Sequence, residues 1–250
     1  MTTRLLTPRQ HRLITRIIEE HIKTAEPVSS KMIATSGYFD VRSATIRNEM
    51  ADLEHAGLLA QMHTSGGRVP TANAYRLYVD DLVSREGISI SHTAKRRIDD
   101  ALEESDIVGP EDVNKVLART VGHLSGALVM ASTSHQDETY KVGLSNLFAF
   151  PEFREIERLM GLTDFFDHFD ETFDRMHRRM WGRSEAKVRV CIGSENPDDR
   201  VKDETLIVSR YELPGGTEGS LTLVGPMRMD YRKNIGLMTY AAQAAERYTT

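Results

Sequence analysis

The chain has one cysteine, Cys191, among its 250 residues, and it has no long apolar run. A single cysteine excludes an internal disulfide framework and fits a reducing compartment. No stretch approaches the roughly 20 apolar residues that a membrane-spanning helix needs, and the N-terminus has no apolar core of a signal peptide. These absences predict a cytoplasmic protein that does not enter a membrane.

Motifs that carry catalysis are absent as well. The sequence has no Walker loop, dinucleotide fingerprint, nucleophile elbow or paired cysteine motif. We therefore expect no catalytic residues, no cofactor and no bound metal. Cys191 lies in a strand pattern without a nearby histidine or second cysteine, which favours a small core residue over a nucleophile.

One acidic run has side chains that can hold divalent metals. It consists of Asp164, Asp167, His168, Asp170, Asp174 and His177. Phenylalanines are interleaved with these residues, and this pattern favours an amphipathic helix whose charged face is solvated. We interpret the run in this way rather than as a metal site.

The net charge of −5 is unevenly distributed along the chain. Residues 1–70 contain 9 Lys and Arg against 7 Asp and Glu, a net charge of +2, and the remaining residues contain 23 against 30, a net charge of −7. A mildly basic amino end on an acidic body suits a small DNA-binding domain joined to a body that does not touch DNA.

Two helices are predicted at the amino end. Thr7 is placed to cap the first helix, and Gln10 is placed to complete a capping box. An apolar stripe with helical spacing follows it, as a core-facing helix requires. The second helix is short, covers residues 31–35 and is capped by Ser29 or Ser30.

A third helix begins near Ser43 and has two contrasting faces. Ile46, Met50 and Leu53 share one face, which we expect to be buried. The sides and the opposite face carry Ala44, Thr45, Arg47, Asn48 and Ala51. Arginine can bind guanine and asparagine can bind adenine through two hydrogen bonds each, and threonine can contact a phosphate or a thymine methyl group. This chemistry predicts a DNA-recognition helix that reads base edges in the major groove.

A short basic hairpin is predicted directly after the third helix. Gly66 and Gly67 are expected to supply the positive φ angles of its tight turn. Donors to phosphates or to the minor groove come from His63, Thr64, Ser65 and Arg68. Three helices and a hairpin predict a winged helix-turn-helix domain over residues 1–82. The alternative is a winged helix that binds another protein.

The predicted DNA-binding surface assigns a role to each kind of side chain. Thr45, Arg47 and Asn48 are expected to read bases, whereas Lys31, Arg42 and Arg68 are expected to contact phosphates. The rest of the surface consists of Ser29, Ser30, Ser43, His63, Thr64 and Ser65.

The rest of the chain alternates between helix and strand patterns. Residues 83–120 read as a linker with two amphipathic helices, and residues 121–250 as a second domain. Strand patterns cover residues 126–131, 139–148, 187–192, 205–211 and 220–224, and helix patterns surround residues 153–160 and 230–247. Strands flanked by helices predict an α+β domain.

Several motifs, in order, resemble the HrcA family of heat-inducible transcription repressors. They are EPVSSKMIA (26–34), SATIRNEMADLEHAGLL (43–59), HTSGGRVPT (63–71), YRLYVDDL (75–82), NLFAFPEF (146–153), IGSEN (192–196) and GPMRMDY (225–231). The resemblance implies a winged helix-turn-helix followed by a GAF-like domain. It also implies a homodimer that binds the CIRCE inverted repeat upstream of chaperone operons of the grpE-dnaK-dnaJ and groELS type. A GroEL-type chaperonin is implied as the partner that keeps the repressor folded.

The sequence departs from the family in length and at one position before the third helix. Family members carry a long segment between the first strand of the body and the NLFAFPEF-like motif, where this chain has little more than residues 134–138. We therefore interpret the chain as a shortened member, with a reduced GAF-like domain lacking most of the inserted dimerisation segment. Arg42 stands where Ser or Pro is usual, which removes an N-cap and adds a cation. A ligand-responsive regulator of other genes remains an alternative.

Overall fold

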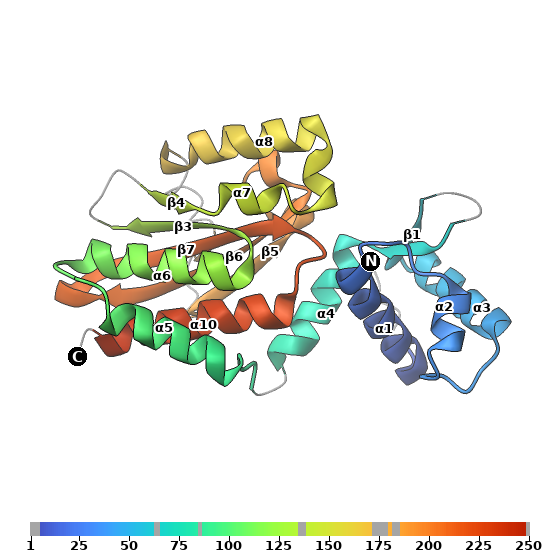
Figure 1. Cartoon of the computed structure of the whole chain (residues 1–250). Helices are drawn as coiled ribbons and strands as arrows, with labels where there is room; N and C mark the ends of the chain where they lie inside the picture. Colours follow the sequence, from blue (N-terminus) through green and yellow to red (C-terminus); the bar gives the residue numbers. More distant parts are fainter. Residues whose placement is uncertain are drawn as a thin grey trace. The chain divides into compact units, whose positions relative to one another are not determined.

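A computed structural model describes residues 6–62, 66–84, 87–134, 139–171, 180–181 and 186–248. The chain divides into two units, Met1–Glu86 and Gly87–Thr250 (Figure 1). The boundary lies close to the end of the domain that the sequence predicts over residues 1–82. The two amphipathic helices of the predicted linker belong to the second unit.

The first unit consists of three helices, a two-stranded hairpin and a fourth helix. These are α1 (Pro8–Thr24), α2 (Ser30–Thr35), α3 (Ser43–His55), β1 (Leu59–Gln61), β2 (Arg68–Pro70) and α4 (Ala72–Ser84). β1 and β2 are antiparallel, with Leu59 opposite Pro70 and Gln61 opposite Arg68. The first three helices and the hairpin follow in the order that the sequence predicts.

The core of the first unit is formed by one face of each helix. Leu13, Ile14, Ile17 and Ile18 of α1 are fully buried, as the apolar stripe predicts. The predicted capping box at Thr7 and Gln10 is confirmed. Helix α4 packs against α1, where the Tyr75 hydroxyl lies 2.6 Å from Nδ1 of His21. The packed helices α1 and α4 therefore support α3 and the hairpin.

The second unit is built on a five-stranded antiparallel sheet. The strands are β3 (Leu128–Thr133), β4 (Tyr140–Val142), β5 (Val188–Ile192), β6 (Glu204–Leu213) and β7 (Thr217–Pro226), in the order β4-β3-β7-β6-β5. β6 and β7 form a long hairpin with Glu204 opposite Pro226 and Leu213 opposite Thr217. The predicted strands at 187–192, 205–211 and 220–224 are confirmed.

Helices cover both faces of this sheet (Figure 1). One face carries α5 (His92–Glu103), α6 (Pro110–Ser125) and α10 (Tyr231–Tyr248). The other face carries α7 (Leu144–Leu147), a 3-10 turn (Pro151–Arg154) and α8 (Ile156–Asp167). Short 3-10 turns also occur at Gly193–Glu195, Asp199–Val201 and Pro214–Gly216. The arrangement is α+β and is consistent with a GAF-like domain.

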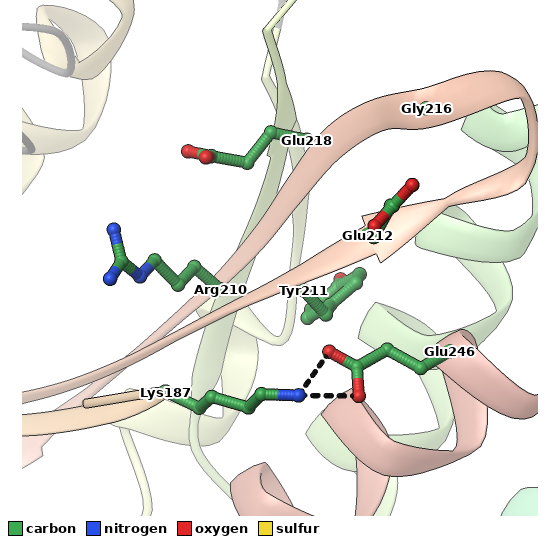
Figure 2. A pocket seen from close by; sticks show the side chains of 7 residues that line it. All are labelled: Lys187, Arg210, Tyr211, Glu212, Gly216, Glu218 and Glu246. Atoms are coloured by element: carbon green, nitrogen blue, oxygen red, sulfur yellow. Dashed lines mark hydrogen bonds and ion pairs between the residues drawn. The ribbon is translucent and has the colours of Figure 1, made fainter. Parts of the chain in front are cut away.

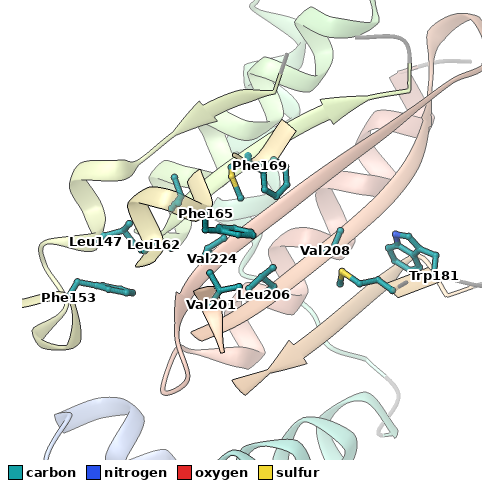
Figure 3. Close-up of a cluster of buried hydrophobic side chains, with 13 residues drawn as sticks. Leu147, Phe153, Leu162, Phe165, Phe169, Trp181, Val201, Leu206, Val208 and Val224 are labelled. Carbon is teal, nitrogen blue, oxygen red and sulfur yellow. The ribbon is translucent and has the colours of Figure 1, made fainter. Parts of the chain in front are cut away.

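The core beneath α8 is rich in aromatic side chains (Figure 3). Phe153, Phe165 and Phe169 pack on Leu206 and Val208 of β6. Phe165 and Phe169 meet edge to face, with ring centroids 5.4 Å apart. Phe165 and Phe169, which lie between acidic residues of this run, therefore form the buried face of an amphipathic segment, as predicted, and Cys191 packs against the same cluster.

Two predicted elements have different boundaries in the structure. The strand pattern over 139–148 ends at Val142, and residues 144–147 form α7. Gly143 causes this change: its φ is +87°, and a Cβ there would lie 2.4 Å from the carbonyl oxygen of Ala127. The helix pattern around 153–160 is interrupted because Glu155 is extended, so Phe153 lies in a 3-10 turn before α8.

Candidate nucleic-acid interface

Helix α3 separates apolar from polar side chains. Ile46, Met50 and Leu53 are at most 1% exposed and form its inner side. On the opposite side, Ala44, Arg47 and Asn48 are exposed and Ala51 is half-buried. Residues spaced three, four and seven apart share one helix face, so these four residues form a continuous strip. We refer to Ala44, Arg47, Asn48 and Ala51 as the exposed face of α3.

The side chains of Arg47 and Asn48 make no hydrogen bond or ion pair within the part of the chain that the structure describes. Their donors therefore face solvent. Thr45, the third predicted base-reading residue, is half-buried beside them. Ala44 and Ala51 have small side chains, so little protrudes from the strip beside these polar groups.

Other charges of the first unit are bound internally. Glu49 of α3 is 8% exposed and is bound by Arg9 of α1. Arg16 binds Glu20 at 3.0 Å. The buried Glu49 was not predicted from the sequence, although its position three residues after Ile46 places it on the inner side of α3. The internal pairs leave Arg47 as an exposed cation of the helix.

The start of α2 lies against the start of α3. The hydroxyls of Ser30 and Ser43 lie 3.2 Å apart, and Ser30 is 8% exposed. Ser29 caps α2, because its hydroxyl accepts a hydrogen bond from the Met32 amide at 3.1 Å. These three serines therefore join or cap helices, and two of them hold the α2–α3 junction together.

Two cations flank these serines: Lys31 follows Ser30, and Arg42 precedes Ser43. Both are exposed. Neither has an ion pair with a described residue. Arg42 occupies the N-cap position of α3 without a side-chain hydrogen bond, as its departure from the family pattern predicts. The junction thus presents two cations beside the uncapped N-terminus of α3.

Arg68, which the sequence predicts to contact phosphates, is bound to a carboxylate within the first unit. Its side chain is 16% exposed, and Nε donates to Oε2 of Glu54 on α3 at 2.8 Å. Its backbone also pairs with Val28, through N–H to O distances of 2.9 Å in both directions. The residue therefore connects the hairpin to α3 and to the segment before α2.

Gly67 also has a different role from the one predicted. It has no positive φ. A Cβ at this position would lie 2.7 Å from backbone atoms of Pro27 and Val28. Glycine is required because the two backbones approach closely, rather than because of the turn itself. The predicted donors His63, Thr64 and Ser65 lie outside the described residues.

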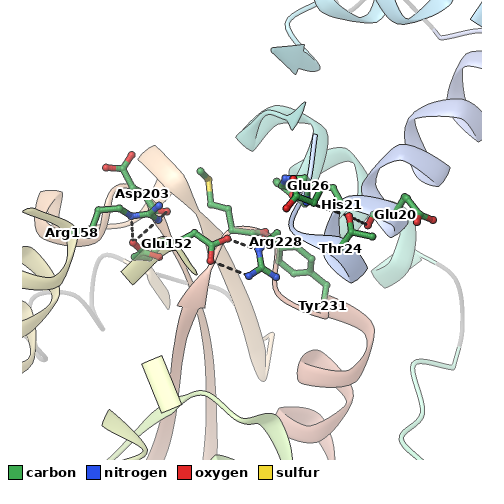
Figure 4. Close-up of polar contacts among 12 residues, drawn as sticks. Glu20, His21, Thr24, Glu26, Glu152, Arg158, Asp203, Arg228 and Tyr231 are labelled. Carbon is green, nitrogen blue, oxygen red and sulfur yellow. Dashed lines mark hydrogen bonds and ion pairs between the residues drawn. The ribbon is translucent and has the colours of Figure 1, made fainter. Parts of the chain in front are cut away.

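Among the described residues of the second unit, charged side chains line hollows at two places. One, of about 420 Å³, lies near the turn of the β6–β7 hairpin, where Lys187 binds both carboxylate oxygens of Glu246 at 2.7 Å (Figure 2). The other, of about 710 Å³, is lined by Arg154, Arg158 and Glu204 among others. Arg158 binds Glu204. Arg228 separately binds Glu152 (Figure 4). Each hollow contains an ion pair among charges of both signs, Lys187–Glu246 in the first and Arg158–Glu204 in the second, so neither indicates a particular ligand.

Two carboxylates of the acidic run around α8 form ion pairs with basic residues. Asp164 lies 3.0 Å from Arg200, and Asp170 lies 3.3 Å from Lys141. The Asp164 backbone and carboxylate raise the pKa of the His168 imidazole. Among the described residues, no group of three or more potential ligands is arranged for a metal. Asp174 and His177 lie outside the described residues.

Comparison with known proteins identifies the family. The model of the HrcA protein C-terminal domain matches residues 43–235. The chain belongs to the HrcA family. The heat-inducible transcription repressor HrcA of Natranaerobius thermophilus is 27% identical, and that of Oceanobacillus iheyensis is 26% identical, each over 94% of both chains. HrcA relatives are heat-inducible transcription repressors, so the resemblance read from the motifs is confirmed.

The HrcA relatives contain residues that this chain lacks. The two alignments extend over 329 and 328 positions, although the chain has 250 residues. A crystal structure of a hypothetical protein has the same fold, with a TM-score of 0.78 and 18% identity over 98% of this chain and 99% of the other. None of the helices that the structure describes is long and apolar enough to cross a membrane.

Proposed function

We propose that residues 1–82 form a winged helix-turn-helix that binds double-stranded DNA. In this arrangement α3 enters the major groove and the β1–β2 hairpin is the wing. The observation that carries the proposal is the state of Arg47 and Asn48, which are exposed and unpartnered among the described residues. In the same unit Arg9 and Arg68 are bound to carboxylates.

The exposed face of α3 has the chemistry of a base-reading surface. The Arg47 guanidinium matches the O6 and N7 acceptors of guanine, and the Asn48 amide matches N6 and N7 of adenine. Thr45 supplies a hydroxyl for a phosphate and a methyl group for thymine. Ala44 and Ala51 allow the helix to lie deep in the groove.

The α2–α3 junction has the chemistry of a phosphate-binding surface. Lys31 and Arg42 supply two cations without internal partners among the described residues. The first amides of α3 are not capped by a side chain, and amides at a helix N-terminus favour an anion. Such contacts position the protein on DNA without reading its sequence.

The proposed biological role is repression of chaperone operons of the grpE-dnaK-dnaJ and groELS type. A homodimer would bind the two half-sites of a CIRCE-like inverted repeat in the cytoplasm and block the promoter. Membership of the HrcA family supports this role, since the curated relatives are heat-inducible transcription repressors. We further propose that this shortened chain dimerises without most of the inserted segment, and that a GroEL-type chaperonin keeps it folded.

A fluorescence-anisotropy titration tests the proposal. The purified protein is titrated against a CIRCE-like inverted repeat and a scrambled duplex at near-physiological salt. Binding to the repeat at least about a thousandfold tighter than to the scrambled duplex is expected for a specific repressor. Equal weak binding to both would contradict the operator assignment. No salt-sensitive binding to either duplex would instead support a protein-binding winged helix.

A second titration of operator binding, made after the protein has been heated, distinguishes chaperonin-dependent folding from regulation by a ligand. Addition of a GroEL-type chaperonin with ATP is expected to restore operator binding by a heated sample. Recovery without chaperonin would contradict the dependence on a chaperonin. Retention of operator binding at heat-shock temperature when a metabolite is added would favour a ligand-responsive regulator.

A further inference from the structure

We infer that Arg68 is a positioning residue, which fixes the wing against the recognition helix through Glu54. The inference rests on the proposed DNA-binding function and changes the role that the sequence predicts for this arginine. Arg42, which is proposed to contact a phosphate, is exposed. Only 16% of the Arg68 side chain is exposed, and its Nε is bound to Oε2 of Glu54 at 2.8 Å.

The backbone of Arg68 connects the hairpin to a second segment, the one that precedes α2. It exchanges two hydrogen bonds of 2.9 Å with Val28, just before α2. It also lies opposite Gln61 in the β1–β2 ladder. One residue thus joins the lead to α2, the hairpin and the C-terminal half of α3. The close approach of Gly67 to Pro27 allows this arrangement.

The ion pair also changes the charge that α3 presents to DNA. Glu54 is 32% exposed, and an unpaired carboxylate there would repel a nearby phosphate. On the inner side of the same helix, Arg9 neutralises the buried Glu49. Two arginines from outside α3 therefore compensate two of its carboxylates, while Arg47 stays available on the exposed face.

The test compares Arg68→Ala and Glu54→Gln with the matched control Arg42→Ala. Operator affinity and the slope of log K against log salt are measured for each variant and for the wild-type protein. A positioning role predicts that both Arg68→Ala and Glu54→Gln weaken operator binding about tenfold, the effect of one charge-assisted hydrogen bond, with the salt slope unchanged. Arg42→Ala should lower the slope by about 0.9.

The Glu54→Gln variant separates the two roles of Arg68. A phosphate-binding Arg68 would be released by this change, so operator binding would stay equal or become tighter. That result, or a lower salt slope in Arg68→Ala, would overturn the inference. The exchange variant with Glu54→Arg and Arg68→Glu should recover affinity if the pair positions the wing.

Hydrogen exchange at the amides of Val28 and Arg68 provides a readout that does not depend on DNA. The inference predicts faster exchange at both amides in Glu54→Gln than in the wild-type protein, whereas unchanged exchange would overturn it. If the wild-type protein bound no duplex, the proposed function would fail, while the exchange result would still decide whether the ion pair fixes the hairpin.

Discussion

Arg158 of α8 binds the buried carboxylate of Glu204 at the start of β6. Its Nη2 and Nε lie 2.7 and 3.1 Å from Oε1, while Oε2 has no hydrogen-bond partner among the described residues. Glu204 is 3% exposed. Burial raises the pKa of its carboxyl to about 7, although the charge of Arg158 opposes this rise. The pair therefore connects α8 to the sheet, and the free energy that it costs to bury the charged carboxylate depends on pH.

Glu204 predicts a specific pH dependence of stability. Its pKa of about 7 in the folded chain exceeds its ordinary value of 4.5, so between these pH values the folded state holds a proton that the unfolded state has released. The contribution of Glu204 to stability is therefore greatest below pH 4.5 and falls by about 3 kcal/mol as pH rises to 7. The Glu204→Gln variant has no carboxyl at this position, so its stability should lack this pH dependence.

Urea unfolding at several pH values, followed by Trp181 fluorescence, measures this effect. Trp181 is the single tryptophan of the chain and lies in the core beneath α8. The wild-type protein should lose stability relative to Glu204→Gln between pH 4.5 and 7. Glu157→Gln, which removes an exposed carboxylate from the same helix, is the control. A difference that stayed constant or reversed sign would contradict the assignment.

The Tyr211 hydroxyl predicts a second stability effect. It donates a hydrogen bond to Oδ1 of Asn114, and Asn114 Nδ2 donates to the Ser132 carbonyl at 2.9 Å. Tyr211→Phe leaves the buried Oδ1 without this donor and should lower the free energy of unfolding by about 1–3 kcal/mol. Tyr248→Phe changes a 41% exposed tyrosine and should have less than about 0.5 kcal/mol of effect. Equal stability of the two variants in urea would contradict the buried role.

The cations of the α2–α3 junction predict a change in salt dependence. Lys31→Ala and Arg42→Ala should each weaken binding to the inverted repeat and the scrambled duplex by a similar factor. Each should lower the slope of log K against log salt by about 0.9, because one phosphate contact is lost. Lys23→Ala removes an exposed lysine from the end of α1 and serves as the control. A loss confined to the inverted repeat would show that these residues read sequence.

The order of elements in the first unit could be predicted because its signals are local. Thr7 and Gln10 form the predicted capping box, and the apolar spacing of α3 places Arg47 on the outside. Ion pairs between distant residues could not be predicted. Nothing near Arg68 in the sequence identifies Glu54 as its partner, because the pair depends on how the hairpin folds back on α3.

The second unit shows where periodicity is ambiguous. The alternating strand at 188–192 was predicted because one face is apolar. The run over 139–148 begins with strand-forming residues such as Tyr140 and Val142, but at Gly143 the chain turns into α7 because its backbone lies close to Ala127. The buried Glu204 also could not be identified from sequence, since its environment comes from Arg158, 46 residues away.

The most direct test of the account is the binding of Arg47→Ala to the inverted repeat and to the scrambled duplex. Arg47 has no partner among the described residues, so its removal should leave the fold unchanged and affect DNA alone. Loss of a bidentate base contact predicts about 1–3 kcal/mol weaker binding to the inverted repeat, with little change on the scrambled duplex. An equal loss on both duplexes would contradict the claim that the exposed face of α3 reads the operator.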